Sequence, residues 1–316
     1  MPLSIPGYAS SRKMINPELF SPLDPKLLQE CSICQNSLSY WQDAWMRLRK
    51  NKMAMIGLMM ILFIALFSFL GPYLVAYTYE QQDLSQTLLK PSLKHLFGTD
   101  ELGRDLLIRV MWGGRISLAV GLVASFINLI IGVLWGGISG FIGGKTDEIM
   151  MRIVDVIYSI PILLIVILLM VVLKPGLSNI FIALGISYWV GMARIVRGQI
   201  LSLKEQEFTL AAKVLGASRT QILLRHLLPN TIGPITVNVT LMIPSAIFFE
   251  AFLSFIGLGV RAPMASWGVL ASDGIRAIRG FPFLLAFPAL FICLTMLSFH
   301  FLGDGLRDAF DPRLRK

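Results

Sequence analysis

Two acidic residues, Asp155 and Glu250, lie inside segments that are otherwise apolar. A carboxylate within a membrane is costly unless it is paired or protonated or lines a wet cavity, so each is a candidate for carrying protons or ions. For Asp155 we expect a simpler role, because Arg152 lies three residues earlier on the same helix face and can form a local ion pair with it. Glu250 has no evident partner in its own segment. A neighbouring helix or subunit, protonation, or a wet cavity each remains open.

The other reactive side chains form no catalytic or metal-binding pattern. His95, His226 and His300 fall in separate segments. Cys31 and Cys34 make a C-x-x-C pair that neither a second pair nor a nearby histidine completes, so we attribute this spacing to chance rather than to a zinc or redox site. We therefore expect no catalytic residue, cofactor or metal, and any energy for uphill transport must come from another chain.

The elements that hold these residues are long and apolar. Of the 316 residues, 55% are hydrophobic and 15% charged, and the mean hydropathy is +0.70. Soluble domains carry about 25% charged residues, so this composition excludes an ordinary soluble or disordered chain and indicates an all-α integral membrane protein. Six segments are long enough to cross a bilayer: Ala54 to Ala76, Ile116 to Ile142, Ile153 to Leu173, Pro175 to Ala193, Gly233 to Leu258 and Phe281 to Gly303.

The basic residues orient these six transmembrane helices. If both termini are cytoplasmic, 19 of the 28 Lys and Arg residues fall on the cytoplasmic side. This bias explains the net charge of +9 without nucleic acid. It gives four regions: a tail, 1–52, with an interfacial helix near its end; the first span and an external loop, 53–115; a five-helix core, 116–303; and a C-terminal tail, 304–316.

Small residues and prolines indicate how the helices pack. Gly132, Gly136 and Gly140 are spaced four apart, so one face of the second span allows close approach of a neighbouring helix. Prolines in or beside three spans predict bends: Pro161, Pro244 and Pro288.

Residues 204–230, which we call the elbow, predict two short helices between the fourth and fifth spans. Phe208, Ala211, Ala212 and Leu215 form an apolar stripe at helical spacing, and Gly216 is placed to end that helix. A second helix starts with a capping box at Ser218 and Gln221 and runs to Leu228 and Pro229. Such an amphipathic pair suits docking in a groove of a partner; the alternative is that it lies flat on the bilayer.

The Ala-Ala, Gly and Leu-Pro skeleton of the elbow resembles the EAA loop of permease subunits of bacterial ABC importers, although Leu210 and His226 replace the family's usual glutamate and isoleucine. Further stretches resemble the C-type permeases of the peptide and nickel importers: Arg47 to Ile56, Phe97 to Asp105, Met151 to Asp155, Ser159 to Pro161, Leu253 to Gly259 and Ser266 to Gly268. Apart from this resemblance, the residue types in Phe97 to Asp105 predict a turn followed by the start of a helix, with Thr99 or Asp100 as the capping residue.

This resemblance implies a type I ABC importer permease fold in the bacterial cytoplasmic (inner) membrane. It implies a heterodimer with a B-type permease subunit, two ABC ATPase subunits docked on the elbow, and an extracytoplasmic solute-binding protein that docks near Phe97 to Asp105. Peptides are the leading solute by resemblance. The alternative is a self-sufficient, ion-coupled secondary transporter that uses Asp155 and Glu250. It predicts a pair of interrupted spans, which the sequence does not indicate.

Overall fold

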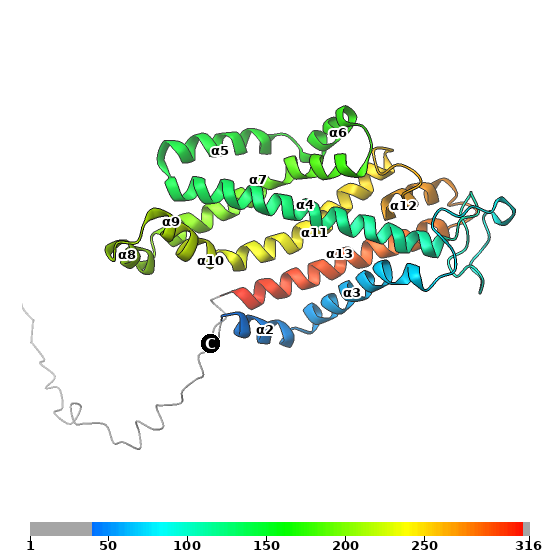
Figure 1. The fold of residues 1–316 in the computed structure, drawn as a ribbon, viewed down its shortest axis with the longest axis horizontal. Helices are drawn as coiled ribbons and strands as arrows, with labels where there is room; N and C mark the ends of the chain where they lie inside the picture. Colours follow the sequence, from blue (N-terminus) through cyan, green and yellow to red (C-terminus); the bar gives the residue numbers. More distant parts are fainter. Residues whose placement is uncertain (1–39, 312–316) are drawn as a thin grey trace, which may run out of the picture. The chain divides into compact units, whose positions relative to one another are not determined.

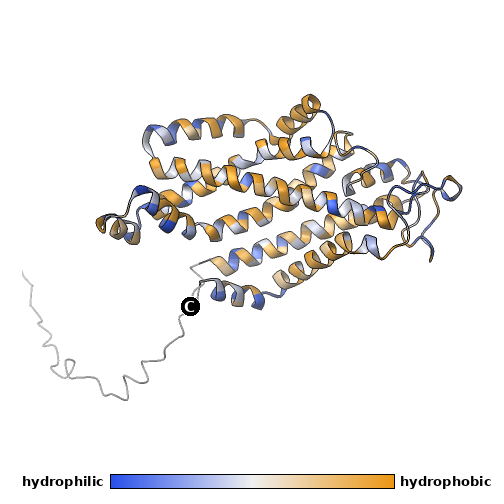
Figure 2. Cartoon of the chain, in the orientation of Figure 1, coloured by the Kyte–Doolittle hydropathy of each residue, from blue (hydrophilic) through white to orange (hydrophobic). Residues whose placement is uncertain are grey.

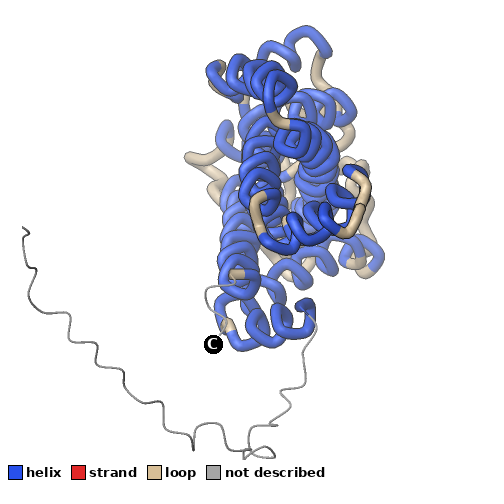
Figure 3. The backbone as a smooth tube through the Cα atoms, turned by 90° about the vertical axis from the view of Figure 1, so that its left-hand side faces the viewer, coloured by secondary structure: helices blue, strands red, loops and turns tan. Residues whose placement is uncertain are grey.

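A computed structural model describes residues 40–311, of which Ala44 onward belongs to one compact unit. These residues fold into helices and loops with no strand, as Figure 3 shows. The membrane-length helices, with the broken pair α5 and α6, are α3 Lys52–Phe69, α4 Leu106–Ile142, α5 Gly144–Ser159, α6 Ile162–Leu173, α7 Leu177–Lys204, α11 Ile232–Phe255 and α13 Phe283–Phe310. The shorter helices are α2 Tyr40–Lys50, η2 Gly71–Tyr73, η3 Leu84–Gln86, α8 Glu207–Val214, α9 Arg219–Gln221, η4 Ile222–Leu227, α10 Leu228–Asn230 and α12 Trp267–Arg276.

The long helices run side by side as a bundle with two distinct ends (Figure 1). One end holds α8, α9 and α10, with α2 and the last turn of α13; we call it the elbow end. The other, the loop end, holds the 70–105 segment and α12. Apolar residues cover the helices between the ends, and polar residues gather on the loops and short helices (Figure 2). This distribution fits a bilayer around the middle of the bundle.

The prediction of a multi-span helical protein is confirmed, with several differences in bounds. Five single helices are long and apolar enough to cross a membrane, and the bent pair α5 and α6 makes a sixth. The first helix ends at Phe69 rather than near Ala76, the second starts at Leu106 rather than Ile116, and the fourth continues to Lys204. The apolar runs mark only the part of a helix that suits hydrocarbon. The second span extends into more polar sequence before its apolar run, and the fourth span does so after its own.

The third span is broken, which the sequence analysis did not predict as an interruption. Helices α5 and α6 meet at an angle of 83° around Ile160 and Pro161. Proline lacks the amide hydrogen that would continue the ladder, and the residue before it is extended, with φ −91° and ψ 129° at Ile160. The bend expected near Pro161 is thus a full break, while Pro244 and Pro288 lie inside continuous helices.

Helix α4 lies directly against α7 along its glycines. A side-chain carbon added at Gly132 would come within 2.5 Å of the Met192 Cβ, and one at Gly136 within 2.2 Å of the Ala193 carbonyl oxygen. At Gly140 it would lie 3.0 Å from the Arg197 carbonyl oxygen. The close approach that the four-residue spacing predicts is therefore made by α7.

Candidate functional site

The elbow is two helical pieces joined by a sharp turn. Helix α8 ends at Val214, and Gly216 follows with φ +84°, the left-handed conformation that favours glycine. Ser218 and Gln221 then form the predicted capping box, with the Gln221 amide donating to the Ser218 hydroxyl at 3.3 Å. The chain continues through a π-helical turn, η4, and the short α10 into α11. Pro229 therefore lies in the first turn of α10, and the helical path does not stop there.

The elbow has one face turned toward the bundle and one turned away. Ala212, Ile222 and Leu227 are buried in a cluster with Val196 and Ile200 of α7, and Leu228 packs partly against it. The remaining apolar side chains of α8, and Leu215 directly after it, are exposed: Phe208, Leu210, Ala211, Val214 and Leu215. The predicted stripe is therefore split, because Ala212 anchors the elbow while its neighbours form an outer apolar surface.

Polar contacts tie the elbow end of α7 to α4 and α5. The Arg197 guanidinium donates from Nε and Nη2 to both carboxylate oxygens of Asp147, each at 2.6 Å. Ser139 donates to the same carboxylate. The Lys204 ammonium donates to the Phe141 carbonyl oxygen at 2.7 Å, where α4 is about to end. Two-point guanidinium pairing fixes geometry as well as distance, so the three helices are braced where the elbow begins. The sequence analysis missed this pair, because its two residues lie 50 positions apart and on different helices.

Asp155 does not pair with Arg152. Its carboxylate instead accepts a hydrogen bond of 2.6 Å from Arg194 on α7, whose guanidinium also lies 3.9 Å from the Tyr158 ring centroid. The local ion pair predicted from spacing is wrong, because Arg194 of a neighbouring helix supplies the donor instead of Arg152.

Glu250 is completely buried, and hydroxyl groups surround its carboxylate. Ser254, one turn further along α11, donates at 2.7 Å, and Ser117 on α4 donates at 3.2 Å. The Ser117 hydroxyl in turn accepts from the Trp267 amide of α12 at 3.2 Å. The expectation that its own span holds no partner is therefore wrong. Glu250 joins α4, α11 and α12 near the loop end.

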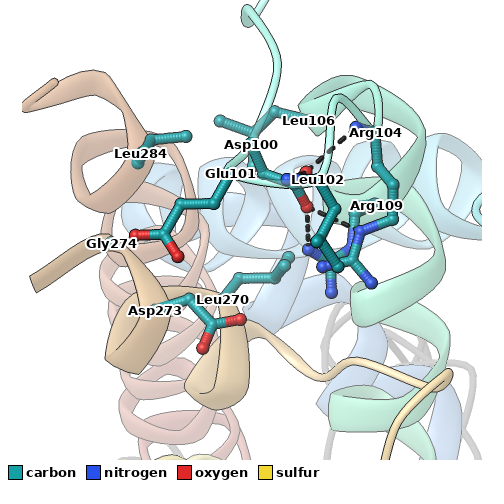
Figure 4. Close-up of a pocket in the computed structure, with 10 residues that line it drawn as sticks. All are labelled: Asp100, Glu101, Leu102, Arg104, Leu106, Arg109, Leu270, Asp273, Gly274 and Leu284. Atoms are coloured by element: carbon teal, nitrogen blue, oxygen red, sulfur yellow. Dashed lines mark hydrogen bonds and ion pairs between the residues drawn. The ribbon is translucent and has the colours of Figure 1, made fainter. Parts of the chain in front are cut away.

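At the loop end, a charged cluster lies between the start of α4 and α12 (Figure 4). Asp100 accepts from Arg104 at 2.7 Å and also pairs with the buried Arg109. Asp105, and not Thr99 or Asp100, caps α4, because its carboxylate accepts from the Ile108 amide at 3.1 Å. The cluster borders a cavity of about 220 Å³.

The opposite wall of that cavity is formed by α12 and the start of α13, with Asp273 facing the arginines (Figure 4). Burial raises the pKa of the Asp273 carboxyl above its usual range, and Arg109, Arg276 and Arg104 partly oppose that rise. Sequence analysis missed Asp273, because no local pattern distinguishes it from a surface acid on a short helix.

Residues 40–311 contain no group of three or more His, Cys, Asp or Glu residues placed to hold a metal ion. Cys31 and Cys34 lie outside the described residues.

The helices long and apolar enough to cross a membrane, with a braced, amphipathic elbow at one end, define an integral membrane protein of the all-helical class. The fold resembles a solved structure titled "Inward facing conformations of the MetNI methionine ABC transporter", with a TM-score of 0.51 and 18% identity over 65% of this chain and 96% of the other. This similarity establishes the fold class, that of an ABC importer permease.

The family follows from two sequence matches. Residues 130–316 match the binding-protein-dependent transport system inner membrane component, and residues 39–91 match the N-terminal transmembrane domain of oligopeptide transport permease C. The chain belongs to the binding-protein-dependent transport permease family, as a multi-pass inner-membrane protein whose ATP hydrolysis is supplied by separate subunits.

Several relatives are similar over nearly their whole length. The oligopeptide transport system permease protein OppC of Bacillus subtilis is 52% identical, covering 94% of this chain and 98% of the relative. The dipeptide transport system permease protein DppC of the same organism is 54% identical, covering 90% of this chain and 89% of the relative. OppC of Escherichia coli strain K12 is 47% identical, covering 88% of this chain and 92% of the relative.

Proposed function

We propose that this chain forms one half of the translocation pathway of an ATP-driven peptide importer. The observation that carries this proposal is the elbow, which is braced on the bundle side and presents an exposed apolar surface on the other. An apolar surface bordered by charges is what a helix needs to dock in a groove of a partner protein. The names of the similar permeases, which transport oligopeptides or dipeptides, support peptides as the solute.

The partners in this proposal are a B-type permease subunit, two ABC ATPase subunits and an extracytoplasmic solute-binding protein. Both termini and the elbow would face the cytoplasm. Two observations support that orientation. In the six-span topology, 19 of the 28 Lys and Arg residues fall on the side of the membrane that holds both termini. In the structure, α2, the end of α13 and the elbow share one end of the bundle (Figure 1). The binding protein would then dock at the loop end, where Phe97 to Asp105 lie.

The mechanism we propose is a rigid-body movement coupled to the ATPases. When the ATPases close, each would displace the elbow docked on it. The Asp147 and Arg197 pair and the Lys204 contact would pass that displacement to α4, α5 and α7 together, because close glycine packing leaves α4 and α7 little freedom to slide. The spans would then alternate between inward-open and outward-open arrangements.

A photocrosslinking experiment in intact cells tests the docking step. A photoreactive residue is placed at Leu215, 86% exposed on the elbow, and as a control at Leu93, 99% exposed in the loop-end segment. We expect the Leu215 position to capture a protein that carries an ATP-hydrolysing domain, and the Leu93 position not to capture it. Capture of lipid alone at Leu215 and at a second elbow position, Phe208, would show that the elbow lies flat on the bilayer and would refute the proposal.

A further inference from the structure

The cavity at the loop end has walls of opposite charge. Its volume is about 220 Å³, and it lies between the start of α4 and the short helix α12. Arg104 and Arg109 share the single carboxylate of Asp100, so the α4 side carries an excess positive charge. The carboxylates of Glu101 and Asp273 lie on the other side of the cavity, away from the arginines (Figure 4). Positive and negative side chains therefore face each other across an open space.

Two of these groups lack a partner. Within residues 40–311, Asp273 forms no ion pair, and no hydrogen bond stabilises its carboxylate. Arg109 is only 4% exposed, and its Nε is a buried donor without an acceptor among these residues. Buried polar groups are normally hydrogen-bonded, and an unpaired one is costly. The cavity therefore lacks an acceptor for Arg109 and a cation for Asp273.

The two missing groups define the charge of an occupant. An anion would pair with Arg109, but Asp273 and Glu101 would repel it. A metal cation, or a basic side chain of another protein, would pair with the two carboxylates and leave the Arg109 donor unsatisfied. A zwitterion brings both charges at once and can direct each toward the opposite wall.

The size and position of the cavity limit the occupant further. About 220 Å³ is less than the roughly 300–1,000 Å³ of pockets that hold drug-sized ligands, so the occupant is a small molecule. Glu101 and Leu102 border the cavity and are exposed, so a solute can reach it from the loop end.

We propose that this cavity binds a small molecule that carries both an ammonium and a carboxylate group, as amino acids and short peptides do. The carboxylate would accept hydrogen bonds from Arg109 and Arg104, and the ammonium would donate to Asp273 and Glu101. Because Asp273 lies on α12 and the arginines lie at the start of α4, the bound molecule would connect these two elements. The proposal does not depend on the proposed function, since all of these side chains belong to this chain.

Ligand-observed NMR tests the proposal on the full chain, purified in detergent together with the subunits that accompany it. The proposed binding protein is left out, because it would bind peptide itself. The probes are L-alanine and L-alanyl-L-alanine, which carry both charges, and N-acetyl-L-alanine and L-alanine amide, which each lack one. We expect at least one zwitterion to bind at millimolar concentration and both single-charge analogues to bind more weakly. The zwitterion that binds more tightly shows whether the site serves a free amino acid or a peptide.

Variants assign the binding to this cavity. We expect Asp273→Asn, which removes one charge and keeps the size of the side chain, to weaken zwitterion binding by roughly tenfold or more. Asp304→Asn, at an exposed position of α13, is the matched control and should bind like the wild type. If Asp273→Asn does not assemble, Glu101→Gln, at an exposed position, takes its place.

Three results would overturn the proposal. The first is that neither zwitterion binds to the wild type. The second is that a single-charge analogue binds as tightly as the zwitterions, since only one wall of the cavity would then be used. The third is unchanged binding in the cavity variant, since the site would then lie elsewhere in the complex. None of these measurements requires transport, so their results are independent of the importer assignment.

Discussion

Glu250 shows how a carboxyl group is accommodated inside a helix bundle, completely shielded from solvent. Hydroxyl donors from Ser254 and Ser117 contact it, and none of its described hydrogen bonds or ion pairs involves a cation. Buried polar groups are stable when hydrogen-bonded and costly when left without a partner. A structural role in joining α4 to α11 therefore accounts for Glu250 without ion transport.

We expect Glu250→Gln to keep both assembly and uptake, because the amide oxygen can accept from one of the two hydroxyls and the amide NH2 can donate to the oxygen of the other. Glu250→Leu removes the acceptor and should lower the free energy of unfolding by about 1–3 kcal/mol. Thermal unfolding of the purified complex and uptake in cells measure the two effects. Loss of uptake in a stable Glu250→Gln variant would instead support the ion-coupled transporter.

Asp273 should make the stability of the loop end depend on pH. Burial raises its folded pKa above the unfolded value, with Arg109 and two other arginines opposing the rise. The contribution of Asp273 is thus most favourable below its unfolded pKa and is lost as pH rises through the raised folded pKa.

The Asp273→Asn side chain stays uncharged at every pH. Its melting temperature should equal that of the wild type at about pH 4 and exceed it at about pH 7. Melting curves of the two purified proteins across this range measure the difference. A melting-temperature difference that does not change with pH would contradict the shifted pKa.

At the scale of single residues, the sequence identified the unusual acids but not their partners. Ser254 lies one helical turn after Glu250 on α11, so this contact could have been predicted from the spacing of the two residues. The contacts of Asp155 with Arg194 and of Glu250 with Ser117 join different helices, and no periodicity within one segment reveals which helix lies beside it.

Among the described helices, α4 and α7 share the most extensive contact, and the glycines of α4 provide a matched test. A carbon added at Gly136 would lie 2.2 Å from a carbonyl oxygen of α7, whereas at the adjacent Gly137 its nearest contact is the Leu228 Cδ2 at 3.8 Å. Carbonyl oxygens of a packed helix cannot move aside as a side chain can.

We therefore expect Gly136→Ala to lower the free energy of unfolding by about 1–3 kcal/mol through overpacking. Gly137→Ala should leave it unchanged or raise it by up to about 1 kcal/mol, because alanine favours the helix. Chemical or thermal unfolding in the same detergent compares them. Equal destabilisation by the two variants would show that α4 and α7 separate under those conditions.

The helices themselves were predicted better than their limits. Long apolar runs gave the number of spans, since about 20 apolar residues are needed to cross a bilayer. Helix α4 begins before its apolar run, where Asp105 caps it and Arg109 pairs with Asp100. Helix α7 continues after its own apolar run, where Arg197 pairs with Asp147. The break at Pro161 was read only as a bend, since the apolar run continues across it.

For the whole molecule, the proposed mechanism requires the elbow to transmit movement without deforming. Gly216 sets the angle between its two parts with φ +84° and has no atom within 4 Å of an added side-chain carbon. A β-branched residue there is therefore strained by its backbone conformation and not by crowding, at about 1–3 kcal/mol.

We expect Gly216→Val to abolish uptake while the chain still reaches the membrane in normal amounts. Gly280→Val is the control, because Gly280 also has open space around it and no positive φ. Uptake of a labelled peptide and immunoblots of membrane fractions measure the two properties. Normal uptake by Gly216→Val would show that the angle of the elbow does not matter for coupling.

The break between α5 and α6 has a consequence for how the chain is made. The twelve residues of α6 extend only about 18 Å, short of the roughly 30 Å of hydrocarbon, and α5 carries several charged residues. During synthesis, therefore, neither α5 nor α6 should insert stably into the lipid bilayer by itself. Val166 and Met170 of α6 are buried with Ile180 and Ala183 of α7, so this crossing should enter the bilayer only together with the helix synthesised after it.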